Sequence, residues 1–409
     1  MMPISGEVCV VGAGPVGGTL ACRLAAAGVP TVVVDRAPLP PMEHPAFDGR
    51  AYAIAAGSRR LLTDAGIWEK LPAPSCPILE IRVSDGRLGR PASSLYLHFD
   101  HTEVGPGAGP FGWMTEARSL RVALNEHMHA LPNLLVFAPA EARVARSAKG
   151  AVVRLSAGEE IACRLVVAAE GRSSPLREQA GIPVTRLPYR QTSVVCAVAH
   201  ERPHSNVALE HFLPGGPFAQ LPMSPSEAGQ NLSAIVWTDH NDVADRMAAL
   251  DDAVLARQIA RRLGDHLGAL RLVGRRWRYP LSAILAHRYV DTRLALVGDA
   301  AHGIHPIAGQ GLNLGFRDAI ALADLVIAAH RAGEDPGSPR LLAKYQRARR
   351  PDNLAMLVAT DALDRLFSNS NPVLRLARDV GIAAVNRTLP LKRVFMRQAM
   401  GIGVLPGVG

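Results

Sequence analysis

The sequence of 409 residues has few lysines, few cysteines and no long apolar run. Arginine carries almost all of the basic charge, because the only lysines are Lys70, Lys149, Lys344 and Lys392. The five cysteines are odd in number and lack Cys-x-x-Cys spacing, so we expect neither a disulfide framework nor a metal site. No apolar run reaches the roughly 20 residues that cross a bilayer, so we expect no transmembrane helix.

The N-terminus leads into an apolar segment at residues 8–11 without a charged leader or a cleavage site, and we therefore expect a cytoplasmic protein. Lysine plus arginine (45) exceed aspartate plus glutamate (36) by nine. That excess admits nucleic acid, an anionic membrane or an acidic protein as a partner. Its position along the chain decides among them.

Most of the excess positive charge lies in residues 338–400, which contain twelve basic and four acidic residues. The spacing predicts helices there, with breaks at Pro351, Pro372 and Pro390. Apolar residues alternate with the basic ones, a pattern typical of a helical tail that contacts a membrane surface or an accessory protein. Helices packed on the rest of the protein with solvated basic faces are the other interpretation. No motif supports nucleic-acid binding.

A glycine-rich turn follows the first apolar segment. Residues 12–18 read GAGPVGG, a helical pattern follows, and the next apolar segment, 31–34, ends at Asp35. Strand, glycine turn, helix, strand and acid in this order predict a dinucleotide site. Gly12 allows the turn, Gly14 lets a diphosphate approach the backbone, and Gly17 lets the helix pack on the sheet. The pattern does not separate FAD from NAD(P).

A second segment of the same type lies about 290 residues later. A strand-like run over residues 293–297 ends at Gly298 and Asp299, and a glycine-rich stretch, 309–315, opens another helix. One long cofactor spanning both segments is the economical interpretation. Asp299 is then expected to bind its sugar-alcohol chain, and the helix start to face a developing anion such as reduced flavin.

Residues 298–302 and 309–313 resemble the second FAD motif of the class A flavin monooxygenases, the para-hydroxybenzoate hydroxylase-like group. Residues 48–54, residues 216–222 followed by 233–238, and the segment 391–401 resemble its ubiquinone-biosynthesis hydroxylase branch. The resemblance covers essentially the whole chain. It implies an α/β fold: a Rossmann-like FAD-binding domain of the glutathione reductase type, an inserted β-sheet substrate domain and a C-terminal helical region.

The resemblance also implies which residues serve the cofactor and substrate. At the family's third motif this chain has Glu170 where aspartate is usual. Arg50 is expected beside the flavin and Arg118 near its ribityl chain. Expected cofactor contacts are Gly12, Gly14, Pro15, Val16, Gly17, Asp35, Arg36, Arg50, Arg118, Glu170, Gly298, Asp299, Gly309, Gln310, Gly311, Leu312 and Asn313. Expected substrate-pocket residues are Phe218, Trp237 and Pro306, with ordinary core packing as the alternative for the two aromatic residues.

The resemblance implies that NADH or NADPH reduces FAD and that reduced flavin captures O2 as a flavin hydroperoxide, which hydroxylates an aromatic ring. The implied substrate is a polyprenylated phenol of ubiquinone biosynthesis. A small soluble phenol as substrate, or a non-catalytic FAD-stabilised scaffold, are the alternatives. The candidates for acid–base work are His302 and His305, although a structural hydrogen-bonding role fits each of them. Pro306 is the third candidate at the catalytic site, where it is expected to fix the loop that faces the reacting ring, with an ordinary rigid turn as the alternative.

The expected FAD-binding domain is discontinuous. It comprises residues 1–75, 110–180 and 280–335. The expected substrate domain comprises residues 76–109 and 181–279, with strands over 192–199, 207–213 and 232–238 and a helical stretch over 244–263. Residues 336–409 form the expected C-terminal helical region.

Overall fold

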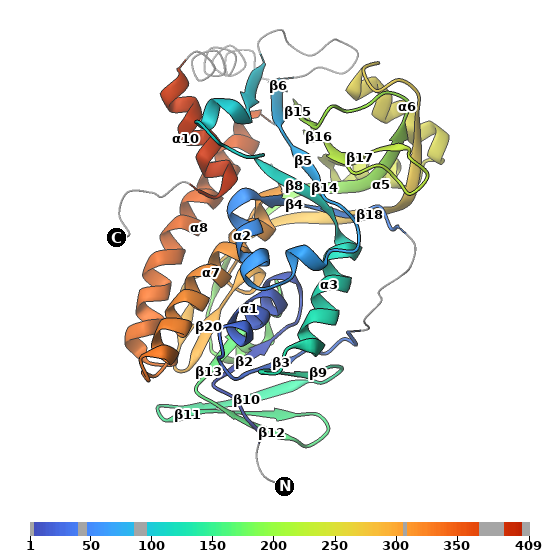
Figure 1. Cartoon of the computed structure of the whole chain (residues 1–409). Coiled ribbons are helices and arrows are strands. Elements are labelled where there is room, and N and C mark those ends of the chain that lie inside the picture. The colour runs from blue at the N-terminus through green and yellow to red at the C-terminus, as the bar shows by residue number, and fades with distance from the viewer. Residues whose placement is uncertain (1–3, 40–46, 86–95, 306–308, 368–387, 403–409) are drawn as a thin grey trace.

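A computed structural model describes residues 4–39, 47–85, 96–305, 309–367 and 388–402 (Figure 1). At its centre lies a six-stranded sheet in the order β19-β20-β13-β2-β3-β9. Its strands are β2 (Val8–Val11), β3 (Thr31–Val34), β9 (Leu134–Phe137), β13 (Leu165–Ala168), β19 (Val290–Asp291) and β20 (Leu294–Leu296). All are parallel except β19. Strands β2, β3, β13 and β20 are buried throughout, as expected of continuous Val and Leu runs in a sheet covered on both faces.

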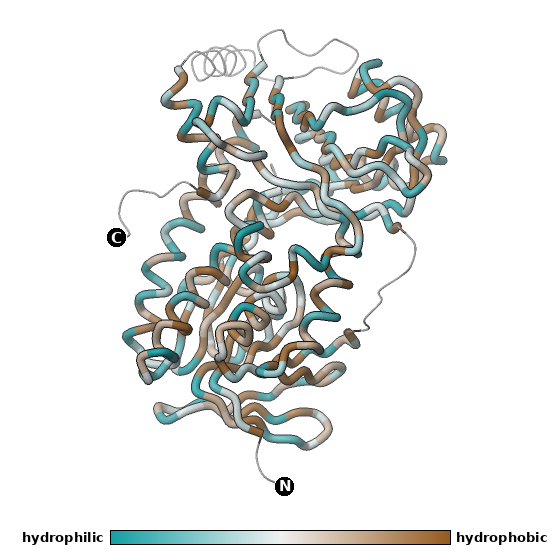
Figure 2. Tube along the Cα trace, in the orientation of Figure 1, coloured by the Kyte–Doolittle hydropathy of each residue, from teal (hydrophilic) through white to brown (hydrophobic). Residues whose placement is uncertain are grey.

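Helices and a second sheet cover the parallel sheet. Helix α1 (Pro15–Ala26) packs on β2 and β3, and contacts α2 (Ala56–Asp64), α3 (Ala117–Ala130) and α7 (Gln310–Arg331). A four-stranded sheet contributes Val144, Val153 and Ile161 to the same hydrophobic core. Its order is β1 (Ile4–Ser5), β12 (Glu160–Cys163), β11 (Gly150–Leu155) and β10 (Ala142–Ser147). Figure 2 shows hydrophobic residues gathered along the central strands.

An eight-stranded sheet occupies the other half of the structure (Figure 1). Two strands of 17 residues, β14 (Val184–His200) and β18 (Leu270–Ala286), pair along it. The remaining strands, in sheet order, are β21 (His302–Gly303) beside β18, then β17 (Asn231–His240), β16 (Gly216–Met223), β15 (Val207–Leu213), β6 (Glu80–Asp85) and β7 (Leu97–Asp100) on the far side of β14. Strand β21 joins this sheet directly after β20 and η3 (Gly298–Ala300), so the two halves are linked beside the second glycine turn.

The eight-stranded sheet packs differently on its two faces. One face, with Phe218, Ile235 and Trp237, packs on α5 (Asn241–Ala248) and α6 (Asp252–Leu263). The other face, with Ala197 and Ala234, packs on a small sheet and on α10 (Leu389–Met400). That small sheet has the order β4 (Ala51–Ala55), β8 (Gly112–Glu116) and β5 (Cys76–Ile78). Three short elements, η1 (Trp68–Lys70), η2 (His101–Val104) and α4 (Pro175–Gln179), complete the described part.

The predicted helical tail differs from expectation at two points. Helix α8 (Pro339–Phe367) runs through Pro351, so the predicted break there is wrong; Pro351 is exposed on the helix. Pro372 lies outside the described residues, whereas Pro390 stands in the first turn of α10, where proline is tolerated. The single helical stretch expected over 244–263 is interrupted at residues 249–251.

Helix α10 is held to η2 by two of its basic residues. The Lys392 ammonium is buried and forms an ion pair with Glu103. The Arg393 Nε donates to the Glu103 carbonyl oxygen at 2.7 Å. Lys392 therefore belongs to the interior and not to a free basic surface. Within the described ranges, no helix is both long and apolar enough to span a membrane.

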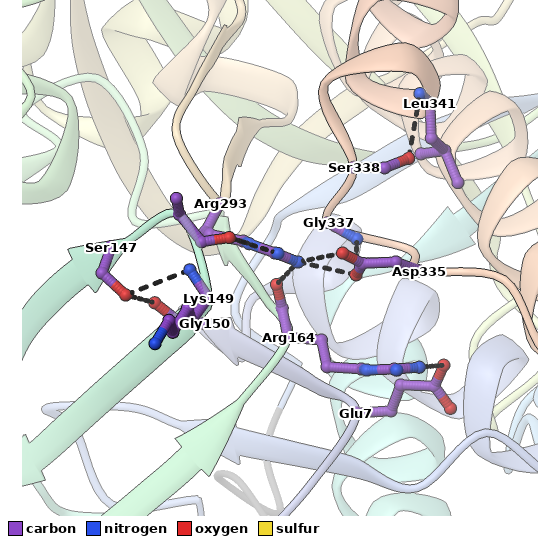
Figure 3. A network of polar contacts seen from close by, with 11 residues as sticks. Glu7, Ser147, Lys149, Gly150, Arg164, Arg293, Asp335, Gly337, Ser338 and Leu341 are labelled. Carbon is purple, nitrogen blue, oxygen red and sulfur yellow. Dashed lines mark hydrogen bonds and ion pairs between the residues drawn. The ribbon is translucent and has the colours of Figure 1, made fainter.

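A buried arginine joins three parts of the fold at the end opposite the eight-stranded sheet (Figure 3). Arg293 donates from Nε and Nη2 to the Ala148 carbonyl oxygen, in the turn between β10 and β11. Its Nη1 donates to the Arg164 carbonyl oxygen before β13, and to both carboxylate oxygens of Asp335 at 2.6 Å. Asp335 lies in the turn between α7 and α8, so one guanidinium fixes a hairpin, a strand start and a helix connection.

Candidate active site

The candidate site lies at the carboxyl edge of the parallel sheet. Strands β2, β3, β13 and β20 are neighbours and run in the same direction, so they end side by side. The residues that follow these strands are Gly12, Asp35, Glu170 and Gly298. Sheets of this kind bind cofactors at this edge. The two glycine motifs, about 290 residues apart in the sequence, therefore meet at one place.

The first glycine turn has no room for side chains at two of its positions. Gly12 has a φ of +105°, and a Cβ atom there would lie 2.4 Å from the Ala169 carbonyl oxygen. A Cβ atom at Gly17 would lie 2.0 Å from the Gly12 carbonyl oxygen. A Cβ atom at Gly14 would meet no atom within 4 Å, and Gly14 is exposed. Gly12 and Gly17 thus serve the turn and its packing, while Gly14 leaves the backbone open to a ligand.

The start of α1 offers an anion site beside Gly14. The helix begins at Pro15, its N-cap Gly14 makes no side-chain cap, and its first turn holds no acidic residue. The first N–H groups of a helix lack partners within the helix and carry a partial positive charge. A diphosphate is the type of ligand that such a helix start binds.

The Asp35 carboxylate binds the backbone around the first glycine turn. Its Oδ2 accepts from the Ala13 N–H at 2.7 Å, and its Oδ1 accepts from the Ala37 N–H at 2.8 Å. Each carboxylate oxygen can accept more than one hydrogen bond, so a ribose hydroxyl can still be bound. The side chain of Arg36 is exposed beside it.

The second glycine turn touches the first. Gly298 has a φ of +58°, and a Cβ atom there would lie 3.4 Å from the side chain of Val16 on α1. Asp299, next to Gly298, has a side chain that is 49% exposed and lies 4.0 Å from the Arg172 Nε. An exposed carboxylate at this position can accept hydrogen bonds from the hydroxyls of a ligand that also reaches α1.

Helix α7 begins at the same edge with another open backbone. Its N-cap Gly309 has a φ of +62°, and no acidic residue occupies the first turn. A Cβ atom at Gly311 would meet nothing within 4 Å, whereas Leu312 packs against the core. The Gln310 Nε2 lies 3.5 Å from the Ala399 carbonyl oxygen of α10. This helix start therefore also presents backbone N–H groups and partial positive charge.

Asn313 fixes the start of α7 against β4. Its Oδ1 accepts from the Ala55 N–H at 2.9 Å, and its Nδ2 donates to the carbonyl oxygens of Ala53 and Gly309 at 2.8 and 3.1 Å. The side chain is buried. The Asn313 amide thus fixes the backbone that borders the site. Because the side chain is engaged in these bonds, the backbone N–H of Asn313 is the group that we expect to contact a cofactor.

His302 belongs to a buried charged network. Its Nε2 lies 2.5 Å from the Asp318 Oδ2, which also accepts from the Gly298 N–H at 3.0 Å. The Asp318 Oδ1 accepts from the Arg349 Nε at 2.8 Å and from the Asn353 Nδ2 at 3.1 Å. Burial would raise the pKa of Asp318, but His302 and Arg349 outweigh it and lower the pKa to about 2. These contacts give His302 a positioning role at the second glycine turn.

The three other charged residues expected at the cofactor have local partners. Arg50 binds the Asp48 carboxylate at 2.6 Å and stacks over the Trp277 ring at 4.3 Å. Arg118 lies 3.5 Å from the Glu116 carboxylate. The third residue, Glu170, binds the start of a short helix.

The Glu170 carboxylate accepts from the Ser174 hydroxyl at 2.5 Å and from the Leu176 N–H at 3.3 Å. Both bonds involve Oε2 and hold the start of α4. Burial raises the pKa of Glu170, and these hydrogen bonds oppose that shift. Glu170 is therefore a helix-capping residue here, and its contacts differ from the cofactor contact that the resemblance implied.

His305 is fully buried between β14 and α8. Its Nε2 lies 3.4 Å from the Gln191 Oε1 and 3.7 Å from the Asp364 Oδ1. The next residue, Pro306, lies outside the described residues, so its expected place at the pocket stays a prediction.

The structure places Phe218 and Trp237 in ordinary core packing, the alternative interpretation for these two residues, and their part in a substrate pocket stays a prediction. Both are buried in the core between the eight-stranded sheet and helices α5 and α6. Their rings meet edge to face at 6.0 Å, and the Arg262 guanidinium lies over Trp237 at 3.5 Å. The alternation of β16 and β17 places the next residues, such as Val236, on the opposite face.

That opposite face carries aliphatic side chains that the neighbouring elements cover only in part. Val195, Leu221 and Val236 lie on the adjacent strands β14, β16 and β17, yet each is only half-buried. Apolar side chains that stay partly exposed on the inner strands of a sheet form a surface that an apolar ligand can cover. These three residues were absent from the sequence-based prediction, although their alternation with Phe218 and Trp237 could have indicated them.

Sequence reasoning also missed the partners of the two histidines. Asp318 is an acid on the buried face of the otherwise apolar helix α7, and that placement alone is a signal. Gln191 and Asp364 gave no such signal, because they approach His305 from two elements distant in sequence.

The residues at this edge fit FAD. Two uncapped helix starts flank open glycines, an exposed Asp299 lies between them, and side chains larger than hydrogen cannot stand at Gly12 or Gly17. A diphosphate fits the α1 start, a sugar-alcohol chain fits Asp299, and an electron-rich ring fits the α7 start.

Comparisons with known proteins agree with this geometry. A family described as "FAD binding domain" matches residues 5–360. Ubiquinone hydroxylase UbiL of Rhodospirillum rubrum is 49% identical over 97% of this chain and 89% of the relative. 3-Demethoxyubiquinol 3-hydroxylase of Escherichia coli is 33% identical over 97% of this chain and 98% of the relative.

One solved structure shows the same fold. It is p-nitrophenol 4-monooxygenase PnpA from Pseudomonas putida DLL-E4, with a TM-score of 0.77 and 20% identity over 98% of this chain and 99% of that chain. The predicted α/β fold with a Rossmann-like FAD-binding unit is therefore confirmed. The chain belongs to the FAD binding domain family and is an FAD-dependent monooxygenase of the ubiquinone hydroxylase group.

Proposed function

We propose that the protein hydroxylates the ring of a polyprenylated phenol in ubiquinone biosynthesis, using FAD, NADH or NADPH, and O2. The observation that carries the proposal is the 49% identity, over 97% of the chain, with a protein named as a ubiquinone hydroxylase. The open helix starts at the sheet edge support the cofactor assignment. The domain division given above remains part of the proposal.

Bound FAD, once reduced, supplies the activated oxygen. The chain's own residues bind and orient the cofactor. N–H groups at the start of α1 hold its diphosphate, and Asp35 and Asp299 accept from its hydroxyls. The start of α7 would present its partial positive charge to a flavin bound at this edge and would stabilise negative charge on that ring. Asn313 holds the start of α7 against β4, and Asp318 holds the second glycine turn at Gly298.

The substrate ring is proposed to lie against Val195, Leu221 and Val236, on the face of the sheet away from α5 and α6. The aliphatic character and partial exposure of these residues support this assignment. An isoprenoid chain adds apolar surface that such a wall can cover.

Two measurements test the proposal. A strain lacking the gene should accumulate the prenylated precursor that lacks one ring hydroxyl, and the chain should restore the later quinones. The purified enzyme, reduced anaerobically by NAD(P)H and then given oxygen with the accumulated precursor, should form the hydroxylated product. Unchanged quinones in the deletion strain, or reoxidation without product, would contradict it. If NAD(P)H reduces the enzyme-bound FAD and oxygen then reoxidises it without forming a hydroxylated product, the scaffold alternative is favoured.

The outer surface of α10 is proposed to contact an anionic membrane. Val394 and Phe395 are 64% and 50% exposed, and Arg397 lies on the same exposed surface. Exposed apolar and basic side chains on one short helix suit the headgroup region of a bilayer. Arg375 and Arg378, two basic residues of the predicted helical tail, lie outside the described residues.

A further inference from the structure

A bulge in β18 lies against the segment that leads into β4. Residues 195–197 of β14 pair with residues 273–277 of β18, so β18 carries extra residues there. A Cβ atom at Gly274 would lie 2.9 Å from the Gly49 nitrogen, and a Cβ atom at Gly49 would lie 2.9 Å from the Arg275 carbonyl oxygen. Both glycines have a positive φ, +72° at Gly274 and +86° at Gly49. The two backbones are therefore in direct contact, and bulges of this kind often re-aim a side chain beside a binding site.

Trp277 ends this bulge and binds the same segment. Its indole Nε1 donates to the Asp48 carbonyl oxygen at 2.8 Å. The Arg275 N–H donates to the same oxygen at 3.2 Å. The Arg50 guanidinium lies over the Trp277 ring, 4.3 Å from its centroid. One indole therefore contacts the segment before β4 both through its N–H group and through its ring face.

The Arg50 side chain is held on two sides by these contacts. The Asp48 carboxylate accepts from its Nε at 2.8 Å and lies 2.6 Å from its Nη2, while Trp277 covers the plane of the guanidinium. Within the part of the chain that the structure describes, these bonds leave the Nη1 of Arg50 available to another acceptor. A guanidinium that is already ordered loses little side-chain entropy when it binds an anion or a polar ligand.

The position of Arg50 is close to the edge that fits FAD. Arg50 directly precedes β4, and Ala53 of that strand borders the start of α7, since a Cβ atom at Gly309 would lie 3.1 Å from the Ala53 Cβ. At about 3.3 Å per residue, Arg50 lies roughly 10 Å along the chain from that contact. The long side chain of an arginine at this position is within reach of a ligand bound at the α7 start.

Trp277 also belongs to the face of the sheet proposed to bind the substrate. It is the direct cross-strand partner of Val195, which is in turn the partner of Val236. Directly opposed residues of antiparallel strands project from the same face. All three side chains are partly exposed. The indole therefore ends the row of aliphatic side chains at β18, and its flat ring is suited to contact with an aromatic substrate.

We propose that Trp277 is a positioning residue for two ligands: its ring holds Arg50 beside the FAD-binding edge, and the same ring closes the proposed substrate wall (Val195, Leu221 and Val236) at β18. Loss of the indole releases Arg50 and opens that end of the wall. The role toward Arg50 requires only that the chain binds FAD. The role at the wall rests on the proposed function.

Release of FAD from the diluted holoenzyme, followed by flavin fluorescence, tests the role toward Arg50. Trp277→Leu should release FAD about tenfold faster than wild type, because Arg50 loses both its cation–π contact and its fixed orientation. Arg50→Gln should have an effect of similar size. The double variant should release FAD no faster than either single variant, because both substitutions remove the same contact.

Trp113→Leu is the matched control for the loss of an indole. Trp113 is also half-buried, and the Arg59 guanidinium lies over its ring at 4.5 Å. Its ring packs beside Trp68 on the other side of the small sheet. This variant should release FAD at the wild-type rate, even where its unfolding temperature falls as far as that of Trp277→Leu.

Steady-state kinetics with 2-prenylphenol as the probe tests the role at the wall. Trp277→Leu should raise KM about fivefold and change kcat by less than about twofold in FAD-saturated enzyme, because the indole contributes binding and no chemistry. Trp277→Phe keeps a ring over which Arg50 can lie and a ring at the wall. It should bring both KM and the rate of FAD release to within about threefold of wild type.

Each outcome bears on a different part of the proposal. Additive effects of Trp277→Leu and Arg50→Gln, or FAD release from Trp277→Leu at the wild-type rate, would overturn the positioning of Arg50. An unchanged KM in Trp277→Leu would overturn the place of Trp277 at the wall. Wild-type enzyme that does not hydroxylate the probe or any other prenylated phenol would contradict the proposed function, and the coupling of Trp277 and Arg50 in FAD release would still be measured.

Discussion

The Asp318 carboxylate is fully buried and is bonded by the second glycine turn, by His302 of β21 and by Arg349 of α8. It binds the N–H of Gly298, so the geometry of the second glycine turn depends on a residue 20 positions later on α7. An ionised group in such a place is stable only while its partners remain. Asp318 therefore couples the packing of α7 and α8 to the conformation of the second glycine turn at Gly298.

We expect Asp318→Asn to lower the free energy of unfolding by about 3 kcal/mol at pH 7, because Arg349 and His302 lose a buried carboxylate and, among the described residues, Arg349 keeps only Asp352 as a charged partner. The folded pKa of Asp318, about 2, lies below its ordinary value of 3.8, so its stabilising effect is present above about pH 4 and is lost toward pH 2. In urea unfolding at fixed FAD concentration, wild type and variant should converge as pH falls. The exposed Asp324→Asn on the same helix is the control; equal effects of both variants would contradict the prediction.

At the scale of elements, helix α10 combines an inner and an outer face. Met396 and Met400 are buried, whereas Val394 and Phe395 are exposed on the same turns. The Arg317 Nη2 donates to the Gln398 carbonyl oxygen at 2.9 Å, which fixes the end of α10 to α7. The outer face can therefore change without loss of the inner contacts.

We expect the double variant Val394→Ser and Phe395→Ser to reduce binding to vesicles of anionic phospholipid about tenfold in a sedimentation assay, with FAD content unchanged. Each exposed apolar side chain contributes its insertion free energy to membrane binding. Leu135→Ser, which removes an exposed leucine from β9, is the control and should bind like wild type. If the double variant binds the vesicles as tightly as wild type, the exposed face of α10 is an ordinary solvated surface and not a membrane contact.

Local patterns predicted the parts of the fold that local chemistry determines. Gly12, Gly17 and Asp35 were predictable because a strand end, a tight turn and a helix start follow each other within 25 residues. The role of Asp318 was not, because its partners come from helices distant in sequence. For Phe218 and Trp237, alternation separates the two faces of a strand but does not say which face the helices α5 and α6 cover. Pro351 was misread because an exposed proline can remain within a long, packed helix.

At the scale of the whole molecule, Arg293 connects the layers opposite the site. It holds the β10–β11 turn, the segment before β13 and the α7–α8 turn with one side chain. A Cβ atom at the neighbouring Gly337 would lie 2.1 Å from the Arg164 carbonyl oxygen, so these segments are closely packed. Loss of the guanidinium leaves two carbonyl oxygens and the Asp335 carboxylate without these bonds.

We expect Arg293→Ala to lower the free energy of unfolding by about 3 kcal/mol and to speed proteolysis within the β10–β11 turn and the α7–α8 turn. Arg154→Ala removes an exposed arginine that pairs with Glu160 on neighbouring strands. This control should change stability by less than about 1 kcal/mol. Proteolysis of Arg293→Ala at the rate of the control would contradict the assigned role.

Helix α8 carries Arg349 near its middle and Asp364 near its end, 15 residues apart. At about 1.5 Å per residue these two positions lie roughly 22 Å apart along the helix. Arg349 binds Asp318, which holds the second glycine turn, and Asp364 lies beside His305. Inserting or deleting one residue between them would rotate Asp364 by about 100° around the helix axis. We therefore expect the length of this stretch to matter more than its residues: substitutions between positions 349 and 364 should be tolerated more readily than the insertion or deletion of a single residue.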